Sequence, residues 1–159
     1  MNTTILTRHL ILVRHAQAAP ARPGQDDFDR ALTPAGLLQC QQLGDWLESR
    51  VTISDTTVLT SPAARAIQTT RAILDGWFSG KVETDERLWA ATPGAIMEVI
   101  NTTPGKLVLV AHNPGLESLQ RAMTGQLLPM PTAGAFELEY IDRYTARRLA
   151  SFQPGSESR

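Results

Sequence analysis

Three segments of the sequence place cationic or imidazole side chains at the end of a short run typical of a β-strand, or a few residues after it. Arg14 and His15 follow HLILV, Arg65 lies four residues after TTVLTS, and His112 follows KLVLVA. A neutral imidazole is a nucleophile near neutral pH, and a guanidinium group binds the oxygens of a phosphate or a carboxylate. Together these residue types could bind an anion and transfer a phosphoryl group, provided that the fold brings them to one place.

A metal site is the competing interpretation of the histidines. His9, His15 and His112 are the only imidazoles, and the sequence contains no HxH, HExxH or cysteine cluster. Arg14 beside His15 would also repel a divalent cation. We therefore expect neither a bound metal nor another cofactor.

The elements that must position these residues follow from the hydrophobic pattern. The apolar runs at residues 9–14 and 106–112 are continuous rather than alternating, which is typical of strands buried on both faces of a parallel sheet. Residues 56–61 are predicted as a further strand from their β-branched content. In segments 135–141 and 147–152 apolar and polar residues alternate, which predicts an antiparallel pair of strands at the sheet edge. A weaker strand is expected at 81–84.

Four helices are predicted where a proline follows a capping residue or the end of a strand. They begin at Thr33-Pro34, Ser61-Pro62, Thr92-Pro93 (through about Ile100) and Asn113-Pro114 (ending near Gly125). Strands that alternate with helices predict a three-layer α/β/α fold with a mostly parallel central sheet and an antiparallel edge. We expect one domain over residues 1–159, with the last five or six residues frayed.

The first two helices have apolar faces that predict which side packs on the sheet. The first is expected to bury Leu37, Cys40, Leu43, Trp46 and Leu47. The second is expected to bury Ala63, Ala66, Ile67, Thr70, Ile73, Leu74 and Trp77. Cys40 is therefore assigned to the core. Because it is the only cysteine, an intrachain disulfide is excluded.

Arg65 is the most informative of the candidate site residues. The carboxyl ends of parallel strands meet at one rim, together with the N-termini of the following helices, so we expect Arg14, His15, Arg65 and His112 to share that rim. Arg65 lies at the start of its helix, where the macrodipole disfavours a cation by about 0.3–1 kcal/mol, and no acidic residue lies within four positions. An anion bound there by the guanidinium and the free N–H groups would explain the placement. His9 precedes its strand and is assigned a structural or surface role at the opposite end.

Bulk composition is that of a soluble globular protein. The chain has 159 residues, 42% of them hydrophobic, and a formal net charge of -1. A near-neutral charge is atypical of nucleic-acid binding proteins. The absence of a long apolar run and of a signal-peptide pattern predicts a cytoplasmic protein with no membrane contact, as a monomer or a small homo-oligomer.

The ordered motifs resemble those of the histidine phosphatase superfamily, which also contains the cofactor-dependent phosphoglycerate mutases. They are LVRHA at 12–16, RALTPAG at 30–36, SPAARAIQTT at 61–70 and LVLVAHNPGLESL at 107–119. The family usually has glycine where Ala16 stands. The resemblance implies that His15 is the nucleophile that takes the phosphoryl group, that Arg14 and Arg65 clamp its oxygens, and that His112 completes the pocket. Arg30 resembles a further phosphate-facing arginine of the short bacterial members.

One departure from the family pattern bears on the substrate. Larger members carry a Glu or Asp that acts as general acid at the position where this chain has Ala90. Asp85 and Glu86 are nearby but align poorly with that position. An imidazole leaving group accepts a proton near neutral pH, whereas an alkoxide needs an acid. Together with the short chain, this resembles the phosphohistidine phosphatases of the SixA type.

Three functions therefore stay open at this point. The first is a metal-independent phosphatase that forms a phosphohistidine intermediate and acts on protein phosphohistidine, with a phosphohistidine-containing signalling protein as partner. The second is a small-molecule phosphomonoesterase with Asp85 or Glu86 as acid, and the third is a non-catalytic module that binds phosphate or a phosphoprotein. The segment LPMPTAGAF at 128–136 could border the pocket mouth or be a plain connecting loop.

Overall fold

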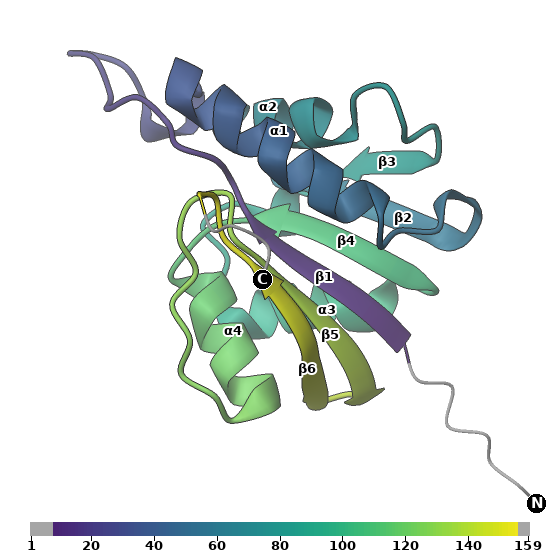
Figure 1. Cartoon of the computed structure of the whole chain (residues 1–159). Coiled ribbons are helices and arrows are strands. Elements are labelled where there is room, and N and C mark those ends of the chain that lie inside the picture. The colour runs from purple at the N-terminus through teal and green to yellow at the C-terminus, as the bar shows by residue number, and fades with distance from the viewer. Residues whose placement is uncertain (1–7, 156–159) are drawn as a thin grey trace, which may run out of the picture.

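The computed structural model describes residues 8–155, which form a six-stranded sheet between two layers of helices (Figure 1). The strand order is β3-β2-β4-β1-β5-β6. Strands β3, β2, β4 and β1 are parallel to one another. Strand β5 pairs antiparallel with β1, and β6 pairs antiparallel with β5. The strands are β1 (Arg8–Arg14), β2 (Thr56–Thr60), β3 (Lys81–Thr84), β4 (Lys106–Ala111), β5 (Ala135–Asp142) and β6 (Thr145–Phe152). The predicted fold class is confirmed, including the antiparallel pair at one edge and the weak strand at the other.

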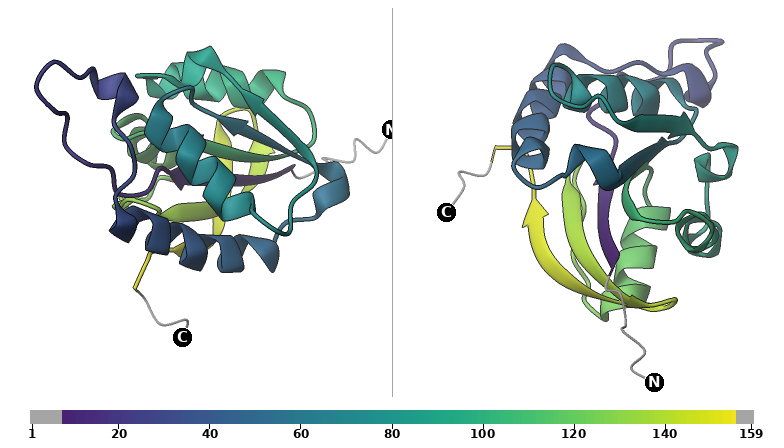
Figure 2. Two further views of the ribbon diagram at one scale, coloured as in Figure 1. Left: turned by 90° about the horizontal axis from the view of Figure 1, so that it is seen from above. Right: turned by 90° about the vertical axis from the view of Figure 1, so that its right-hand side faces the viewer.

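Helices cover both faces of the sheet, as Figures 1 and 2 show. They are α1 (Pro34–Glu48), α2 (Ala64–Leu74), α3 (Pro93–Thr102) and α4 (Gly115–Thr124), with short 3-10 turns η1 (Asp27–Asp29), η2 (Ile53–Asp55) and η3 (Glu86–Leu88). Helices α1 and α2 pack on one face, and α3 and α4 pack on the other. None of the helices between residues 8 and 155 is long and apolar enough to cross a membrane.

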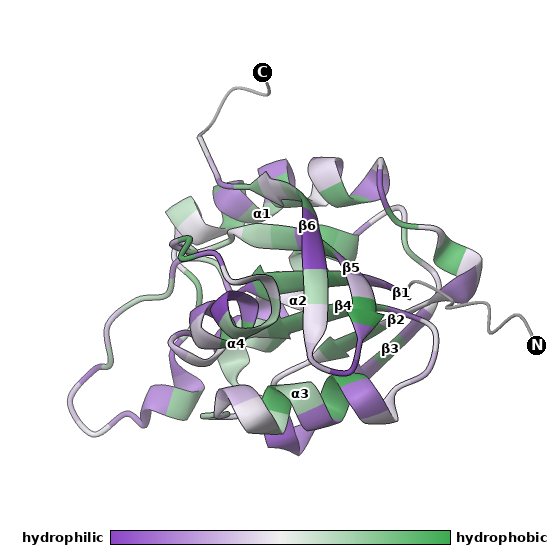
Figure 3. Cartoon of the chain, turned by 90° about the horizontal axis from the view of Figure 1, so that it is seen from below, coloured by the Kyte–Doolittle hydropathy of each residue, from purple (hydrophilic) through white to green (hydrophobic). Residues whose placement is uncertain are grey.

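Strand β1 shows why its apolar run is continuous. Leu10 and Leu12 belong to the core under α3 and α4, whereas Ile11 and Val13 belong to the core under α1 and α2. Successive side chains of a strand point to opposite faces, and both faces of this strand are covered, so all four side chains are fully buried. Each such burial contributes about 1.5–3 kcal/mol. The hydrophobic strands in the middle of the molecule are visible in Figure 3.

The helix starts are predicted well where a threonine precedes the proline. Thr33 and Thr92 accept hydrogen bonds from the backbone N–H groups of Gly36 and Ala95, and α1 and α3 begin at the following prolines. Helices α2 and α4 begin one or two residues later than predicted, at Ala64 and Gly115, and neither has a side-chain cap.

The apolar face predicted for α1 is wrong at Leu37, whose exposed fraction is 49%. The buried face repeats through Gly36, Cys40, Leu43 and Leu47, and Leu37 lies about 100° further around the helix. A Cβ atom at Gly36 would come within 2.2 Å of the Gln17 carbonyl oxygen, so the helix approaches the loop after β1 through its glycine.

The inner face predicted for α2 also differs in part. Ile67 and Trp77 are only half-buried, and the helix ends at Leu74, before Trp77. The buried face instead contains the polar residues Arg65 and Thr69. Cys40 lies in the core as predicted, and burial raises the pKa of its thiol to about 11, which makes it a poor nucleophile. The expected fraying falls largely on residues 156–159, outside the described range.

Candidate active site

The two histidines predicted to share one rim face each other there. Arg14 on β1 and Ala111 on β4 are register partners, so His15 and His112 follow at the same height on neighbouring parallel strands. Their ring centroids lie 5.1 Å apart. The backbone N–H of His15 donates to the Ala111 carbonyl at 3.1 Å, and its carbonyl accepts from Ala133 N–H at 3.0 Å. The structure therefore brings together residues that are 97 positions apart in the chain.

Hydrogen bonds determine which nitrogen of His15 carries a proton. Nδ1 lies 2.8 Å from the carbonyl oxygen of Ala16, an obligatory acceptor, so Nδ1 holds the hydrogen. Nε2 then carries the in-plane lone pair of the ring, which accepts a hydrogen bond from Nε of Arg65 at 3.3 Å. Nε2 is therefore the nitrogen that can attack an electrophile.

Both imidazoles are held in the neutral form. Burial lowers the pKa of His15 to about 4, the hydrogen bond to Ala16 opposes this shift, and the neighbouring Arg65, Arg14 and Arg30 reinforce it. Burial also lowers the pKa of His112 to about 3, with further lowering by His15 and Arg65. Each ring therefore keeps an unprotonated nitrogen at neutral pH, which nucleophilic attack by an imidazole requires.

His112 is oriented by a serine that the sequence analysis did not single out. Its Nε2 lies 2.7 Å from Oγ of Ser61, a fully buried residue directly after β2. The ring also makes an edge contact with Trp89, with centroids 5.3 Å apart and planes at 79°. Ser61 could have been found from its place in the SPAAR motif, because it follows a strand end at the shared rim.

Arg65 is the centre of the site, and its charge is compensated by Asp27. Its side chain is buried; Nη1 donates to the Asp27 backbone carbonyl at 2.7 Å, and Nη2 donates to Asp27 Oδ2 at 3.1 Å. This partner lies 38 positions away along the chain, whereas the sequence has no acidic residue within four positions of Arg65. Arg30 reaches the same carboxylate, with Nε 3.3 Å from Oδ1. Arg30 and Arg65 thus converge on one carboxylate, as they would on a bound oxyanion.

Arg14 is anchored by the segment at 128–136. Its Nη1 donates to the Met130 carbonyl at 3.0 Å, and its backbone N–H donates to the Gly134 carbonyl at 3.0 Å. Glu117 on α4 accepts from Met130 N–H at 2.7 Å and from Nδ2 of Asn113 at 3.0 Å. The segment is therefore more than a connection, because it holds both the backbone and the side chain of Arg14.

Unpaired buried polar atoms gather at this site. Five buried side-chain atoms of the described residues have no hydrogen-bond partner, and four of them belong to the site residues Arg14 (Nε), Arg30 (Nε), His112 (Nδ1) and Asn113 (Oδ1). Arg30 Nε keeps its contact with Asp27 but outside hydrogen-bond geometry. Buried donors without partners are costly, and an oxyanion would supply acceptors for the two guanidinium groups.

Backbone features concentrate here as well. Over residues 8–155, Ala90 and Ala133 are the only non-glycine residues with positive φ, at 50° and 55°. The backbone N–H of Ala133 donates a hydrogen bond to the His15 carbonyl, and Ala90 lines a cavity that opens beside His112. Such conformations cost of order 1–3 kcal/mol and cluster at functional sites.

A cavity of about 480 Å³ opens beside His112. Its wall consists of Asp27, Arg65, residues 89–93, residues 112–115 and Ser118. Neither Asp85 nor Glu86 lines it. The Asp85 carboxylate pairs with Arg87 at 2.7 Å, which lowers the pKa of Asp85, and Asp85 lines a separate depression with Lys81 and Thr102. The two carboxylates considered as general acids therefore lie outside this cavity, and Asp27 is the acidic residue on its wall.

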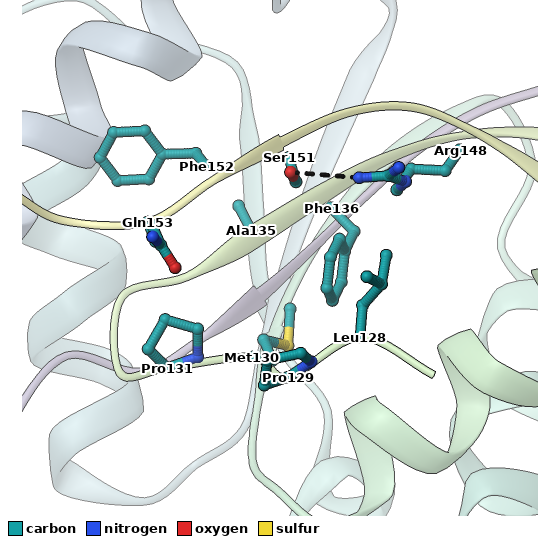
Figure 4. Close-up of a pocket in the computed structure, with 10 residues that line it drawn as sticks. All are labelled: Leu128, Pro129, Met130, Pro131, Ala135, Phe136, Arg148, Ser151, Phe152 and Gln153. Atoms are coloured by element: carbon teal, nitrogen blue, oxygen red, sulfur yellow. Dashed lines mark hydrogen bonds between the residues drawn. The ribbon is translucent and has the colours of Figure 1, made fainter. Parts of the chain in front are cut away.

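A second cavity, of about 320 Å³, lies between the segment 128–131 and the end of β6 (Figure 4). It is lined by Leu128, Pro129, Met130, Pro131, Ala135, Phe136, Arg148, Ser151, Phe152 and Gln153. None of the candidate catalytic residues belongs to this lining. His9 also lies away from the site, at the start of β1, with Nε2 3.4 Å from Glu137 Oε2.

Comparison with known proteins identifies the family. The profile of the histidine phosphatase superfamily (branch 1) matches residues 10–91. An uncharacterized Mycobacterium tuberculosis protein, Rv1276c, is 34% identical over 110 residues, which cover 67% of this chain and 66% of that protein, just under two thirds of its length. An uncharacterized Mycobacterium leprae protein, ML1117, is 29% identical over 155 residues, covering 87% of this chain and 94% of that protein.

Solved structures give the same result. A protein of Agrobacterium tumefaciens, provisionally named the phosphohistidine phosphatase SixA, is 30% identical with a TM-score of 0.82, over 92% of this chain and 98% of that one. The protein histidine phosphatase SixA complexed with tungstate has the same fold, with a TM-score of 0.79 at 22% identity, over 92% and 97% of the two chains. The fold, the family profile and these relatives agree, and the chain belongs to the histidine phosphatase superfamily.

Proposed function

We propose that this chain is a metal-independent phosphatase that hydrolyses protein phosphohistidine through a phosphohistidine intermediate on His15. In the first step, the lone pair of His15 Nε2 attacks phosphorus, the bond to the leaving nitrogen breaks, and its electron pair goes to the leaving imidazole. In the second step, the oxygen of a water molecule attacks this phosphorus, the P–Nε2 bond breaks and its electron pair returns to Nε2 of His15. The attacking water loses one proton to solvent, and inorganic phosphate is released. Arg14, Arg30 and Arg65 stabilise the charge on the phosphoryl oxygens during both steps.

The observation that carries this proposal is the state of His15. Its Nδ1–H is fixed by the Ala16 carbonyl, its Nε2 lone pair faces Arg65, and its pKa is lowered to about 4, mainly by burial. A neutral nitrogen aimed at guanidinium groups has the geometry of a nucleophile beside an anion site. The names of the SixA relatives support phosphohistidine as the substrate.

The surroundings of Asp27, the carboxylate on the cavity wall, indicate which kind of leaving group the site favours. In this structure Asp27 Oδ2 accepts a hydrogen bond from Arg65 and Oδ1 faces Arg30, so both carboxylate oxygens face guanidinium groups. A substrate whose leaving group needs no protein acid therefore fits best, and phosphohistidine is such a substrate because its imidazole accepts a proton near neutral pH.

Trapping the intermediate tests the proposal. The full chain is incubated with labelled phosphoramidate in EDTA and quenched in base, which preserves phosphohistidine. We expect label on His15, no label in His15→Ala, and normal labelling in His9→Ala, which removes the histidine at the far end of β1. Absence of label in the wild type would favour a non-catalytic binding module, and a requirement for added metal would refute metal independence.

A small-molecule phosphomonoesterase is the second candidate, because Asp27 supplies a carboxylate in the cavity. If Asp27 protonates an alkoxide, the wild type hydrolyses alkyl phosphates faster than phosphohistidine, and Asp27→Asn removes that preference. Rates on a panel containing both substrate classes separate the two candidates.

A further inference from the structure

The cavity beside His112 has a composition that suits one kind of leaving group. It lies directly against His112 and Arg65, so that a substrate whose phosphoryl group is held by the arginines would extend into it. Ala90, Ala91 and Pro93 give one side of its wall a small, apolar surface, and Trp89 is the one large aromatic group on the wall. A volume of about 480 Å³ is within the usual range for small-ligand sites.

Trp89 is held in place by three contacts. Besides its contact with His112, its ring meets the ring of Phe28 edge-on, with centroids 5.1 Å apart, and the Arg65 guanidinium carbon lies 5.5 Å from its centroid. These contacts join Trp89 to the turn η1, to the first turn of α2 and to the residue that follows β4. Trp89 remains half-buried and lines the cavity, so an aromatic surface of fixed orientation borders the leaving group.

Asp27 borders the same cavity from η1 and its side chain is 61% exposed. In this structure its carboxylate is held by Arg65 and Arg30. Phosphoryl oxygens that accept from these arginines would compete for their N–H groups. The carboxylate would then be available to a cationic donor on the substrate, on the wall that Trp89 also borders.

We propose that this cavity is the leaving-group subsite, in which Trp89 and Asp27 hold the imidazole of phosphohistidine as a protonated ring; the proposal rests on the phosphatase function above. The substrate ring carries phosphorus on one nitrogen and a proton on the other. When the P–N bond breaks, its electron pair returns to the ring, and the second nitrogen keeps its proton, so neutral imidazole departs. An aromatic face and a carboxylate both stabilise the cationic ring, which is the form that leaves without a general acid.

The experiment compares two substrates that share a P–N bond. Phosphohistidine in a peptide has the ring, whereas phosphoramidate has only ammonia as leaving group. The ratio of kcat/KM for phosphohistidine to kcat/KM for phosphoramidate is measured in the wild type, Trp89→Ala, Trp89→Phe and Asp27→Asn. Trp77→Ala is the matched control, since it removes a half-buried tryptophan beyond the end of α2. Circular dichroism establishes that each variant is folded.

We expect the ratio to fall at least about tenfold in Trp89→Ala and in Asp27→Asn, to fall less in Trp89→Phe, and to stay unchanged in Trp77→Ala. A parallel loss on both substrates would show that Trp89 and Asp27 only position His112 and Arg65, and would overturn the proposal. A larger effect of Asp27→Asn on an alkyl phosphate than on phosphohistidine would make Asp27 a proton donor, with the same consequence. Labelling of His15 by phosphoramidate in the wild type is independent of the ring, so failure of the subsite is distinguishable from failure of the phosphatase function.

Discussion

The neutral histidine pair makes the stability of this protein depend on pH in a predictable direction. The pKa values of His15 and His112 are about 4 and about 3 in the folded chain, against about 6.5 for an unperturbed histidine. Between pH 6.5 and about 4, the unfolded chain therefore binds more protons than the folded one. Under that condition the free energy of unfolding falls as the pH falls.

The size of the effect at pH 5 is set mainly by the unfolded chain. In the unfolded chain the histidines have their ordinary pKa, and pH 5 lies about 1.5 units below it. Each unit corresponds to about 1.36 kcal/mol. Each buried imidazole therefore costs about 2 kcal/mol at pH 5 relative to pH 7, and the pair costs about 4 kcal/mol. Lower folded pKa values hardly change this figure, because at pH 5 both folded imidazoles are already almost entirely neutral.

Urea unfolding at pH 7 and pH 5 measures the effect. The loss of stability between the two pH values is compared in the wild type, His15→Gln, His112→Gln and the double variant, so that carboxylate contributions common to all four chains cancel. We expect the loss to shrink by about 2 kcal/mol in each single variant and by about 4 kcal/mol in the double variant. His9→Gln is the control: it shows how much the loss of stability between pH 7 and pH 5 changes when a histidine outside the site is removed. An unchanged loss in the double variant would refute the inference that burial holds these imidazoles neutral.

Three further predictions concern single contacts. Ser61→Ala removes the partner of His112 Nε2 and should lower kcat roughly tenfold without unfolding the chain; an unchanged kcat would exclude an orienting role. Gly36→Ala forces a Cβ atom to 2.2 Å from a backbone oxygen, whereas Gly94→Ala meets nothing closer than 4.0 Å, so urea unfolding should show a loss of about 1–3 kcal/mol for the first and a gain of up to about 1 kcal/mol for the second. Glu117→Ala removes the acceptor of Met130 N–H and should lower kcat/KM, and Glu117→Gln, which keeps a carbonyl acceptor, should restore most of it; equal losses would assign the effect to charge.

Local patterns determined the elements of this protein. The continuous apolar runs predicted β1 and β4 because a strand that is covered on both faces has no polar side, and the threonine-proline pairs predicted the starts of α1 and α3 because they cap a helix by local hydrogen bonds. The inner face of α1 was predicted less well, since the closest approach is made by Gly36, which hydrophobicity does not mark.

What the amino-acid order determined by itself was the set of reactive groups and their arrival at one rim, because parallel strands end at the same edge. Only the tertiary structure decided how those groups act on one another. Asp27 reaches Arg65 across 38 positions, Trp89 meets both Phe28 and His112, and burial holds the two imidazoles neutral. These contacts join side chains from different elements, and both their geometry and the desolvation they produce exist only once the layers have packed.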